Sequence, residues 1–397
     1  MNRALETFLT SLRLGLTSFG GPIAHLGYFE RAYVREKAWL THEEYSQTVA
    51  LCQLLPGPAS SQVNFLIGLR RAGWAGGLLS WAGFTLPSAL ALYAFAVLAP
   101  ATHGPLLGAA LHGLKLVAVA IVAHAVWGMA PKLCPDRART GIALGALSAL
   151  LLFGGAFMQI AVIVLGAAAG ALLCRGAAPV SGAQTSPIRP GTAWTAGTLA
   201  LLLLALLPLL AAAKPGGLTA IADVFYRAGA LVFGGGHVVL PLLRDALVPA
   251  GLLTDDAFLA GYGVAQAVPG PLFTLSAYLG AAAAPQGAAP PAAWAAAALA
   301  FIFLPGLLLA AAGAPLWRWL SAHPSAQGAL AGINAAVVGI LGAALYDPVW
   351  VTAVRAGPDL VVAAVAFFLL EKWKAPPLLI VGFCVAAAVS GTYLRAI

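Results

Sequence analysis

The stretch that decides the fold reads LRLGLTSFGGP at residues 12–22 and returns as YRAGALVFGGG at residues 226–236. Each copy is followed by a second motif, QLLPGP at 53–58 and QAVPGP at 266–271. The first motifs align at an offset of 214 residues and the second motifs at an offset of 213. Each copy therefore places one arginine, a glycine break and a proline break within apolar sequence. We infer that the chain is built from two copies of one structural unit.

Composition places both copies in a membrane. Hydrophobic residues make up 61% of the 397 residues and charged residues only 9%, whereas soluble domains carry roughly 25% charged residues. Runs such as 198–213 and 292–314 are too apolar to face water. The sequence also lacks the alternating segments of a transmembrane barrel. We therefore expect an all-α polytopic membrane protein.

The remaining composition argues against several kinds of site. The four cysteines, Cys52, Cys134, Cys174 and Cys384, lie far apart without C-x-x-C spacing, so we expect neither a metal site nor a cofactor. Most basic residues lie beside apolar spans, so the net charge of +8 favours orientation in a membrane over nucleic-acid binding. No cleavable signal peptide is evident, because the first apolar helix leads directly into the repeat.

Proline breaks the helices of each copy. A capping box at Thr41 and Glu44 opens a helix, which ends at the PGP motif of 56–58 because proline lacks a hydrogen-bond donor. A second piece covers 60–69, and neither piece reaches the roughly 20 residues of a spanning helix. Two alternatives stay open here: a re-entrant hairpin, or one long helix that is broken at its middle.

Further apolar segments complete the two repeats. Helices are expected over 5–19, 27–38, 74–98, 105–130, 140–154, 157–174, 192–213, 218–233, 254–268, 358–371 and 376–394, the second of them interfacial. The predicted organisation is an N-terminal repeat over 1–175, a polar linker with a connecting transmembrane helix over 176–213, and a C-terminal repeat over 214–397.

Positive charge predicts the orientation of the repeats. If the PGP elements are re-entrant, fourteen of the 21 Lys and Arg residues fall on one side and four on the other. The positive-inside rule makes the first side cytoplasmic, with the loops at 31–37, 70–71 and 132–139. The unmatched span at 192–213 then reverses the second copy. We expect inverted-topology repeats, an architecture of secondary transporters.

Arg13 and Arg227 are the most distinctive charges of the repeats. Each lies in an apolar helix shortly before the FGG triplet. A central arginine costs about 2.5–3.5 kcal/mol to insert, so such residues usually face a cavity or a partner. Repeat symmetry would bring the two guanidinium groups toward one axis, where they could bind a tetrahedral dianion. The alternative is that each arginine snorkels or pairs with an acid such as Glu6 or Asp223.

The glycine and proline breaks form the second part of the predicted anion site. The helix after each PGP motif offers free N–H groups and the positive end of its dipole. Hydroxyl and amide side chains, including Ser61, Gln62 and Ser276, could complete the hydrogen bonds of an oxyanion. The predicted substrate-binding residues of the breaks are Gly20, Gly21, Gly234, Gly235, Pro56, Gly57, Pro58, Pro269, Gly270, Pro271, Ser60, Asn64 and Thr274. The alternative is a pair of structural kinks.

Five further residues are candidates for transport chemistry. His25, His237, Glu43 and Asp256 could couple a proton to transport, although interfacial polar residues are the plainer interpretation of each. Lys115 lies within an apolar span, where it needs a cavity or a partner, and it is a further candidate anion contact.

Taken together, the motifs resemble the chromate transporter family in its long, two-domain form. The resemblance lies in SFGGP at 18–22, WLTxxEY at 39–45, LLPGP at 54–58, VFGGGH at 232–237 and VPGP at 268–271. It implies a bacterial inner-membrane protein that exports chromate and confers resistance, with sulfate as the analogue that competes. The second copy has Gly236 where the first has Pro22, and it lacks the Arg70–Arg71 pair, so the halves need not contribute equally.

These observations predict a transporter that exports a tetrahedral dianion by alternating access. A membrane enzyme is disfavoured, because no nucleophile–base pair or metal cluster stands at useful spacing. A sulfate or molybdate importer and an anion channel stay open as alternatives. Uniport and proton antiport are both physically sufficient, and the oligomeric state, including a homodimer, stays open.

Overall fold

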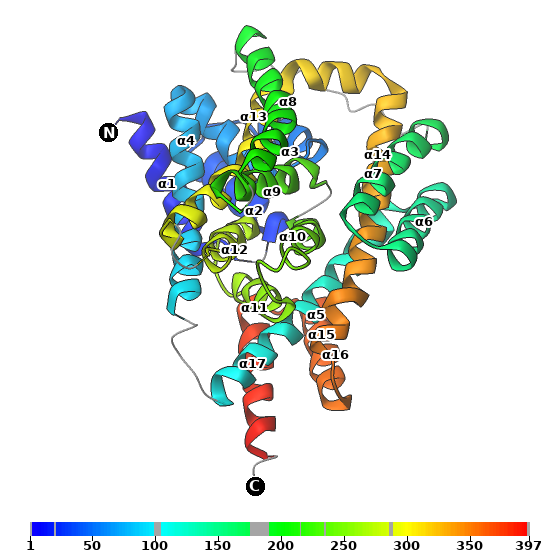
Figure 1. Cartoon of the computed structure of the whole chain (residues 1–397). Helices are drawn as coiled ribbons and strands as arrows, with labels where there is room; N and C mark the ends of the chain where they lie inside the picture. The colour runs from blue at the N-terminus through cyan, green and yellow to red at the C-terminus, as the bar shows by residue number, and fades with distance from the viewer. Residues whose placement is uncertain are drawn as a thin grey trace.

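The computed structural model describes residues 2–19, 21–98, 105–174, 190–214, 216–233, 236–285 and 289–394, and these contain helices without any strand (Figure 1). The first repeat contains α1 (Arg3–Thr17), α2 (Gly21–Phe29), the π-helical η1 (Glu30–Glu36), α3 (His42–Leu54), α4 (Ala59–Leu98), α5 (Pro105–Leu133), α6 (Arg137–Phe153) and α7 (Ala156–Leu173). The expected all-α membrane fold is confirmed, with five helices long and apolar enough to cross a membrane among the described residues.

The second repeat follows a connecting helix. Its elements are α8 (Pro190–Ala213), α9 (Leu218–Leu231), η3 (Gly236–Val238), α10 (Val239–Leu247), α11 (Asp255–Ala265), η4 (Leu272–Thr274), α12 (Leu275–Ala282), α13 (Pro291–Ala322), α14 (Pro324–Ala344), η5 (Leu345–Trp350), α15 (Val351–Ala353), α16 (Gly357–Glu371) and α17 (Pro377–Leu394). The connecting helix α8 is the extra span expected at 192–213. Most of the polar linker before it lies outside the described residues.

The long helix α4 is a hairpin of two helices. Its backbone leaves helical geometry at Ala72 and at Gly73, where φ is 65°. The Asn64 amide donates to Ser80 O at 3.0 Å, and the Ser80 hydroxyl donates to Asn64 O at 2.9 Å. A Cβ on Gly68 would lie only 2.4 Å from the carbonyl oxygen of Gly76. Both contacts join residues that lie at equal distances in sequence before and after Ala72. The two segments therefore run antiparallel in tight contact.

The PGP element of the first repeat is re-entrant. The Arg70 guanidinium lies 3.8 Å from the carboxylate of Glu44. In one continuous helix these residues would be about 39 Å apart, at 1.5 Å per residue. The start of α3 and the end of the first α4 segment therefore lie together, and the turn between the two helices is the PGP motif. The capping box of Thr41 and Glu44 is present as predicted.

The two repeats exchange helices. Helix α14 of the second repeat packs against α6 and α7 of the first, and α5 of the first repeat packs against α16 and α17 of the second. Figure 1 shows α14 in orange beside the green helices α6 and α7. Small residues allow this approach, since a Cβ on Gly332 would lie 2.0 Å from the carbonyl oxygen of Gly166. Neither repeat is a separate packing unit.

Equivalent helices of the two repeats run in opposite directions. The side chain of His112 contacts Asp359 at 2.9 Å, and that of His124 contacts Glu371 at 3.3 Å, so α5 and α16 are parallel. Only three residues separate α5 from α6, which returns across the membrane. Helix α16, the counterpart of α6, therefore crosses in the sense opposite to α6. This arrangement agrees with the predicted inverted repeats.

Each PGP loop is hydrogen-bonded to the helix break of the other repeat. The N–H of Gly57 donates to Val232 O at 2.8 Å, and the N–H of Gly270 donates to Ser18 O at 2.9 Å. Because Gly57 matches Gly270 and Ser18 matches Val232 in the sequence repeat, the two bonds are related by the repeat symmetry. The loops and breaks predicted to form the site thus meet at the interface between the repeats.

Glycine is required in both loops. The φ angles of Gly57 and Gly270 are 115° and 105°, a region that other residues rarely adopt. A Cβ on Gly270 would lie 2.8 Å from the Ser88 hydroxyl, and a Cβ on Gly57 would lie 2.9 Å from Gly306 Cα. Each loop therefore lies directly against the proline-containing helix of the other repeat.

Replacing Gly270 by alanine is expected to lower the stability of the folded protein by about 2–4 kcal/mol, from backbone strain and overpacking. Thermal unfolding in detergent measures the change. Gly128→Ala is the matched control, because a Cβ there meets nothing within 4 Å and alanine favours a helix. Equal melting temperatures for the two variants would contradict this role of Gly270.

Candidate functional site

Buried polar side chains gather beside the paired loops. His25 of α2 is 1% exposed, and its Nδ1 lies 3.5 Å from the Ser60 hydroxyl at the start of α4. The His25 ring meets the edge of Phe84 at 5.3 Å between centroids. The carbonyl of Phe84 in turn borders Gly270 of the second PGP loop. One buried site therefore joins α2, both segments of α4 and the opposite repeat.

Several polar atoms of this region have no hydrogen-bond partner within the described part of the chain. They are Ser18 Oγ, His25 Nε2, Ser61 Oγ, Gln62 Oε1 and Thr85 Oγ1 of the first repeat, with Gln266 Nε2 and Ser276 Oγ of the second. Buried polar atoms are normally paired, and leaving one unpaired costs about 1–3 kcal/mol. These atoms are therefore the candidates for hydrogen bonds to a polar ligand.

The start of α4 adds backbone donors to these side chains. Helix α4 begins at Ala59, directly after the PGP loop, and Ser60 and Ser61 are in its first turn. The first N–H groups of a helix have no partner within it and carry partial positive charge. Gln62 holds this start in place, because its amide donates to Pro56 O at 2.8 Å and to Gly306 O at 2.9 Å. The arrangement can bind an anion through neutral donors.

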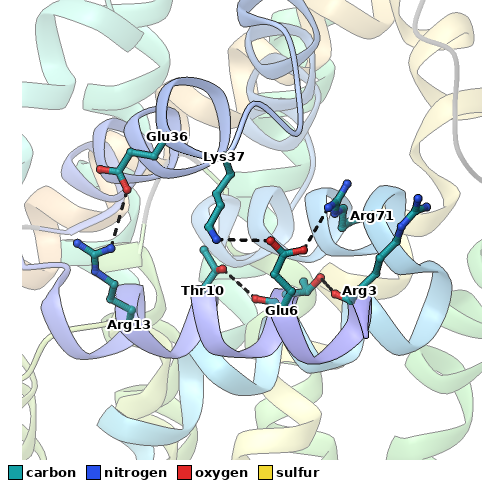
Figure 2. A network of polar contacts seen from close by, with 8 residues as sticks. Arg3, Glu6, Thr10, Arg13, Glu36, Lys37 and Arg71 are labelled. Atoms are coloured by element: carbon teal, nitrogen blue, oxygen red, sulfur yellow. Dashed lines mark hydrogen bonds and ion pairs between the residues drawn. The ribbon is translucent and has the colours of Figure 1, made fainter. Parts of the chain in front are cut away.

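Arg13 and Arg227 each pair with an acid of their own repeat. Arg13 lies 3.9 Å from the carboxylate of Glu36 (Figure 2), and Arg227 is hydrogen-bonded to Asp223 one turn earlier in α9. The sequence suggested Glu6 and Asp223 as possible partners of the two arginines. Asp223 does pair with Arg227, whereas Glu6 pairs with Lys37 and Arg71. Within the described residues, the contacts of the two arginines do not bring them together.

Lys115 and Asp256 form one ion pair. Lys115 Nζ lies 2.6 Å from an oxygen of Asp256, and Arg355 approaches the other oxygen at 3.9 Å. The Lys115 side chain is 5% exposed and that of Asp256 is 59% exposed. The lysine in the apolar span therefore has the partner that its position required, and this partner is one of the candidate proton-coupling residues.

The other candidate proton groups have different surroundings. The His237 ring shares a 2.6 Å hydrogen bond with the hydroxyl of Tyr262, whereas His25 lies beside Ser60. Glu43 is exposed on the first turn of α3 and accepts a bond from Gln47 at 3.3 Å. His25 lies beside the start of α4 after the first loop, and His237 belongs to η3, which packs against η4 directly after the second loop.

Asn64 and Thr274 serve local structure. The side chain of Asn64 accepts from Tyr33 and Ser11 and donates to Ser80, which ties α1 to the α4 hairpin. The Thr274 hydroxyl donates to Pro271 O at 2.7 Å and closes the turn after the second loop. Gly21 begins α2 with φ at 78°. Gly20, Gly234 and Gly235 lie outside the described residues.

Two interfacial carboxylates remain ionised near neutral pH. The guanidinium of Arg35 holds the pKa of Glu30 below its usual value, and the backbone N–H of Thr41 does the same for the pKa of Glu44. Groups with lowered pKa values carry no proton at neutral pH, so neither carboxylate suits proton coupling. Within the described residues, no three His, Cys, Asp or Glu side chains are placed to hold a metal ion.

Ser18 and Thr85 are candidate site residues that the sequence interpretation did not include. Both are fully buried in apolar segments, and each has an unpaired hydroxyl. Their sequence signal is weak, because serine and threonine are common in transmembrane helices, where they bond to their own backbone. Only the packing of Gly270 against Ser18 and Phe84 reveals their position.

Comparison with known proteins agrees with the division of the chain into two repeats. The family model described as "Chromate transporter" matches residues 5–171 and 219–391, the two repeats. The chromate transport protein of Pseudomonas aeruginosa is 29% identical over 389 residues, which cover 93% of this chain and 87% of that protein. The chromate transport protein of Cupriavidus metallidurans is 29% identical over 96% of this chain and 91% of its own length. No solved structure matches the chain.

Lys115 is buried and Asp256 is exposed, so mutations of the two residues should differ in their effect on stability. Asp256→Asn leaves a buried ammonium group without a counter-charge, whereas Lys115→Met leaves a carboxylate that water can solvate. Asp256→Asn should therefore destabilise the protein by at least about 1 kcal/mol more than Lys115→Met. Thermal unfolding in detergent measures both, with Arg355→Gln as the control for an exposed pair. A larger effect of Lys115→Met would show that the pair is not held by burial of the lysine.

Proposed function

Because this chain belongs to the chromate transporter family, we propose that it exports chromate from the cytoplasm by alternating access and so confers chromate resistance. Transport of chromate across a membrane follows from the family and from the chromate transport proteins that this chain resembles. The substrate is a tetrahedral dianion, for which sulfate is the natural competitor.

One observation carries the proposed site. The reciprocal bonds of Gly57 and Gly270 bring both helix breaks together, beside buried hydroxyl and imidazole groups that have no protein partner in the described chain. A tetrahedral dianion needs several donors around its oxygens. Hydroxyl groups, a histidine N–H and the first N–H groups of α4 supply them at a site of low dielectric constant, where hydrogen bonds to an anion are strong.

The repeat architecture supports alternating access. Inverted repeats with broken helices commonly place a substrate site between two halves that rock against each other. Here the same pair of bonds joins each break to the opposite loop, so one arrangement can open toward either face by symmetry. The exchange of α5 and α14 between repeats couples movements of the two halves.

The charge pattern supports export. The loops with most of the Lys and Arg residues lie on the side proposed to be cytoplasmic. A cell interior at negative potential favours loss of a dianion by roughly 2.3 kcal/mol per charge per 100 mV. Export therefore needs no coupled ion. If a proton is coupled, His25 and His237 are the candidates that lie next to the loops.

Removing the unpaired hydroxyls is expected to weaken substrate binding without unfolding the protein. In the double variant Ser61→Ala, Thr85→Val, two buried groups without a protein partner are lost, so stability should not fall. Uptake of radioactive chromate into inverted vesicles should show a KM about tenfold higher or more, the loss expected for hydrogen bonds to a charged ligand. Ser148→Ala, on an exposed helix face, is the control. An unchanged KM in the double variant would rule out this site.

The arginines are tested in the same assay, with sulfate as competitor. Arg13→Ala and Arg227→Ala should each lower transport by about tenfold or more if their guanidinium groups contact the substrate. Because Arg227→Ala also leaves Asp223 buried and unpaired, it is compared with Asp223→Asn combined with Arg227→Gln, which keeps the pair neutral. Unchanged transport in both single variants would exclude the arginines from the substrate site.

A further inference from the structure

Helix α1 has three distinct faces. Thr7, Ser11, Leu14 and Gly15 are buried against α4, and Leu5, Leu9 and Leu16 are exposed apolar side chains suited to lipid. The third face carries a polar residue at every third or fourth position, which makes one stripe along the helix. Its members are Arg3, Glu6, Thr10, Arg13 and Thr17.

The polar stripe cannot face lipid. Charged side chains within a membrane turn to water or to other polar groups, and here the stripe lies under η1 and the turn of the α4 hairpin. Figure 2 shows Glu36 and Lys37 above the stripe and Arg71 beside Glu6. At its inner end the stripe reaches Ser18, whose carbonyl accepts from Gly270 of the second loop. The stripe thus leads from the Arg3 end of the helix to the paired loops.

The carboxylate of Glu6 is held by two cations. One oxygen lies 3.4 Å from Lys37 Nζ, and the other accepts from Arg71 at 3.1 Å. Arg71 is fixed in place by the ring of Trp39, 5.0 Å below its guanidinium carbon. The Glu6 carboxylate, a planar oxyanion, therefore lies between the ammonium group of Lys37 and the guanidinium group of Arg71.

The charged side chains at the polar stripe of α1 carry more positive than negative charge. Glu6 pairs with Lys37 and Arg71, and Glu36 pairs with Arg13, so three cations contact two carboxylates. These contacts leave an excess of one positive charge that can attract an anion. Partly exposed ion pairs are weak, typically below about 1 kcal/mol, so a dianion can exchange with the carboxylates.

The second repeat has no such stripe. In the sequence repeat, Arg3 corresponds to Gly217, Glu6 to Ala220, Thr10 to Val224 and Thr17 to Leu231. Arg71 corresponds to Ala284. Of the stripe positions, only Arg13 has a charged counterpart, Arg227, which pairs with Asp223 of its own helix. A feature needed solely for folding the repeat would be expected in both copies.

We propose that the polar face of α1, together with Lys37 and Arg71, is a capture site for oxyanions on one approach to the paired loops, and that Glu6 occupies it as an internal competitor. The inference rests on the proposed function and adds a residue-level account of its direction. Substrate displaces the Glu6 carboxylate from Lys37 and Arg71 and passes along Thr10, Arg13 and Thr17 toward Ser18.

The sign of the Glu6→Gln effect tests the capture site. With the full chain in inverted vesicles, the KM for chromate should fall by about two- to fivefold in Glu6→Gln, because the competing charge is gone while the cations stay. Arg71→Gln should raise the KM by a similar factor. The maximal rate should change less than twofold in both, because neither residue contacts substrate at the paired loops.

Arg70→Gln is the matched control. Arg70 precedes Arg71 at the same hairpin turn but contacts Glu44 instead, so its KM should equal that of the wild type. A higher KM in Glu6→Gln, or equal effects of Arg70→Gln and Arg71→Gln, would overturn the capture site and leave the proposed function standing. A wild-type chain that moves no chromate would overturn both.

Discussion

The structure depends on two backbone hydrogen bonds, from Gly57 to Val232 and from Gly270 to Ser18. Each broken helix exposes N–H and C=O groups, and within a bilayer such groups must find a partner in the protein. Here the partner of each loop belongs to the other repeat. A single repeat would leave both its loop and its break unsatisfied, so the two copies need each other to fold.

The scaffold is symmetric, whereas the side chains are not. The first repeat contributes most of the unpaired polar groups, including His25, whereas the second contributes Gln266 and Ser276, and only the first carries the full polar stripe on α1. The second repeat contributes the loop of Gly270 and the pair of Asp256 with Lys115. Symmetry supplies two ways of opening, and asymmetry can make one direction of transport more effective than the other.

Full charges and neutral donors occupy different places. Arg13, Arg71 and Lys37 lie in ion pairs that are at least partly exposed, whereas the groups beside the loops are uncharged and buried. Burying an arginine without a partner costs several kcal/mol, but a buried hydroxyl costs about 1–3 kcal/mol. A site lined by neutral donors can therefore persist when substrate is absent and still bind a dianion through many hydrogen bonds.

The sequence by itself determined the membrane class, the two repeats, their inversion and the breaks, because hydropathy, charge asymmetry and the glycine and proline positions are local properties of the chain. The same local signals selected Gly57 and Gly270 and identified Asp223 as a possible partner of Arg227. Only the tertiary structure decided that Lys115 pairs with Asp256, that Asn64 braces the α4 hairpin, and that Ser18 and Phe84 border the second loop. Those contacts join residues far apart in the chain, and their geometry depends on how the two repeats pack.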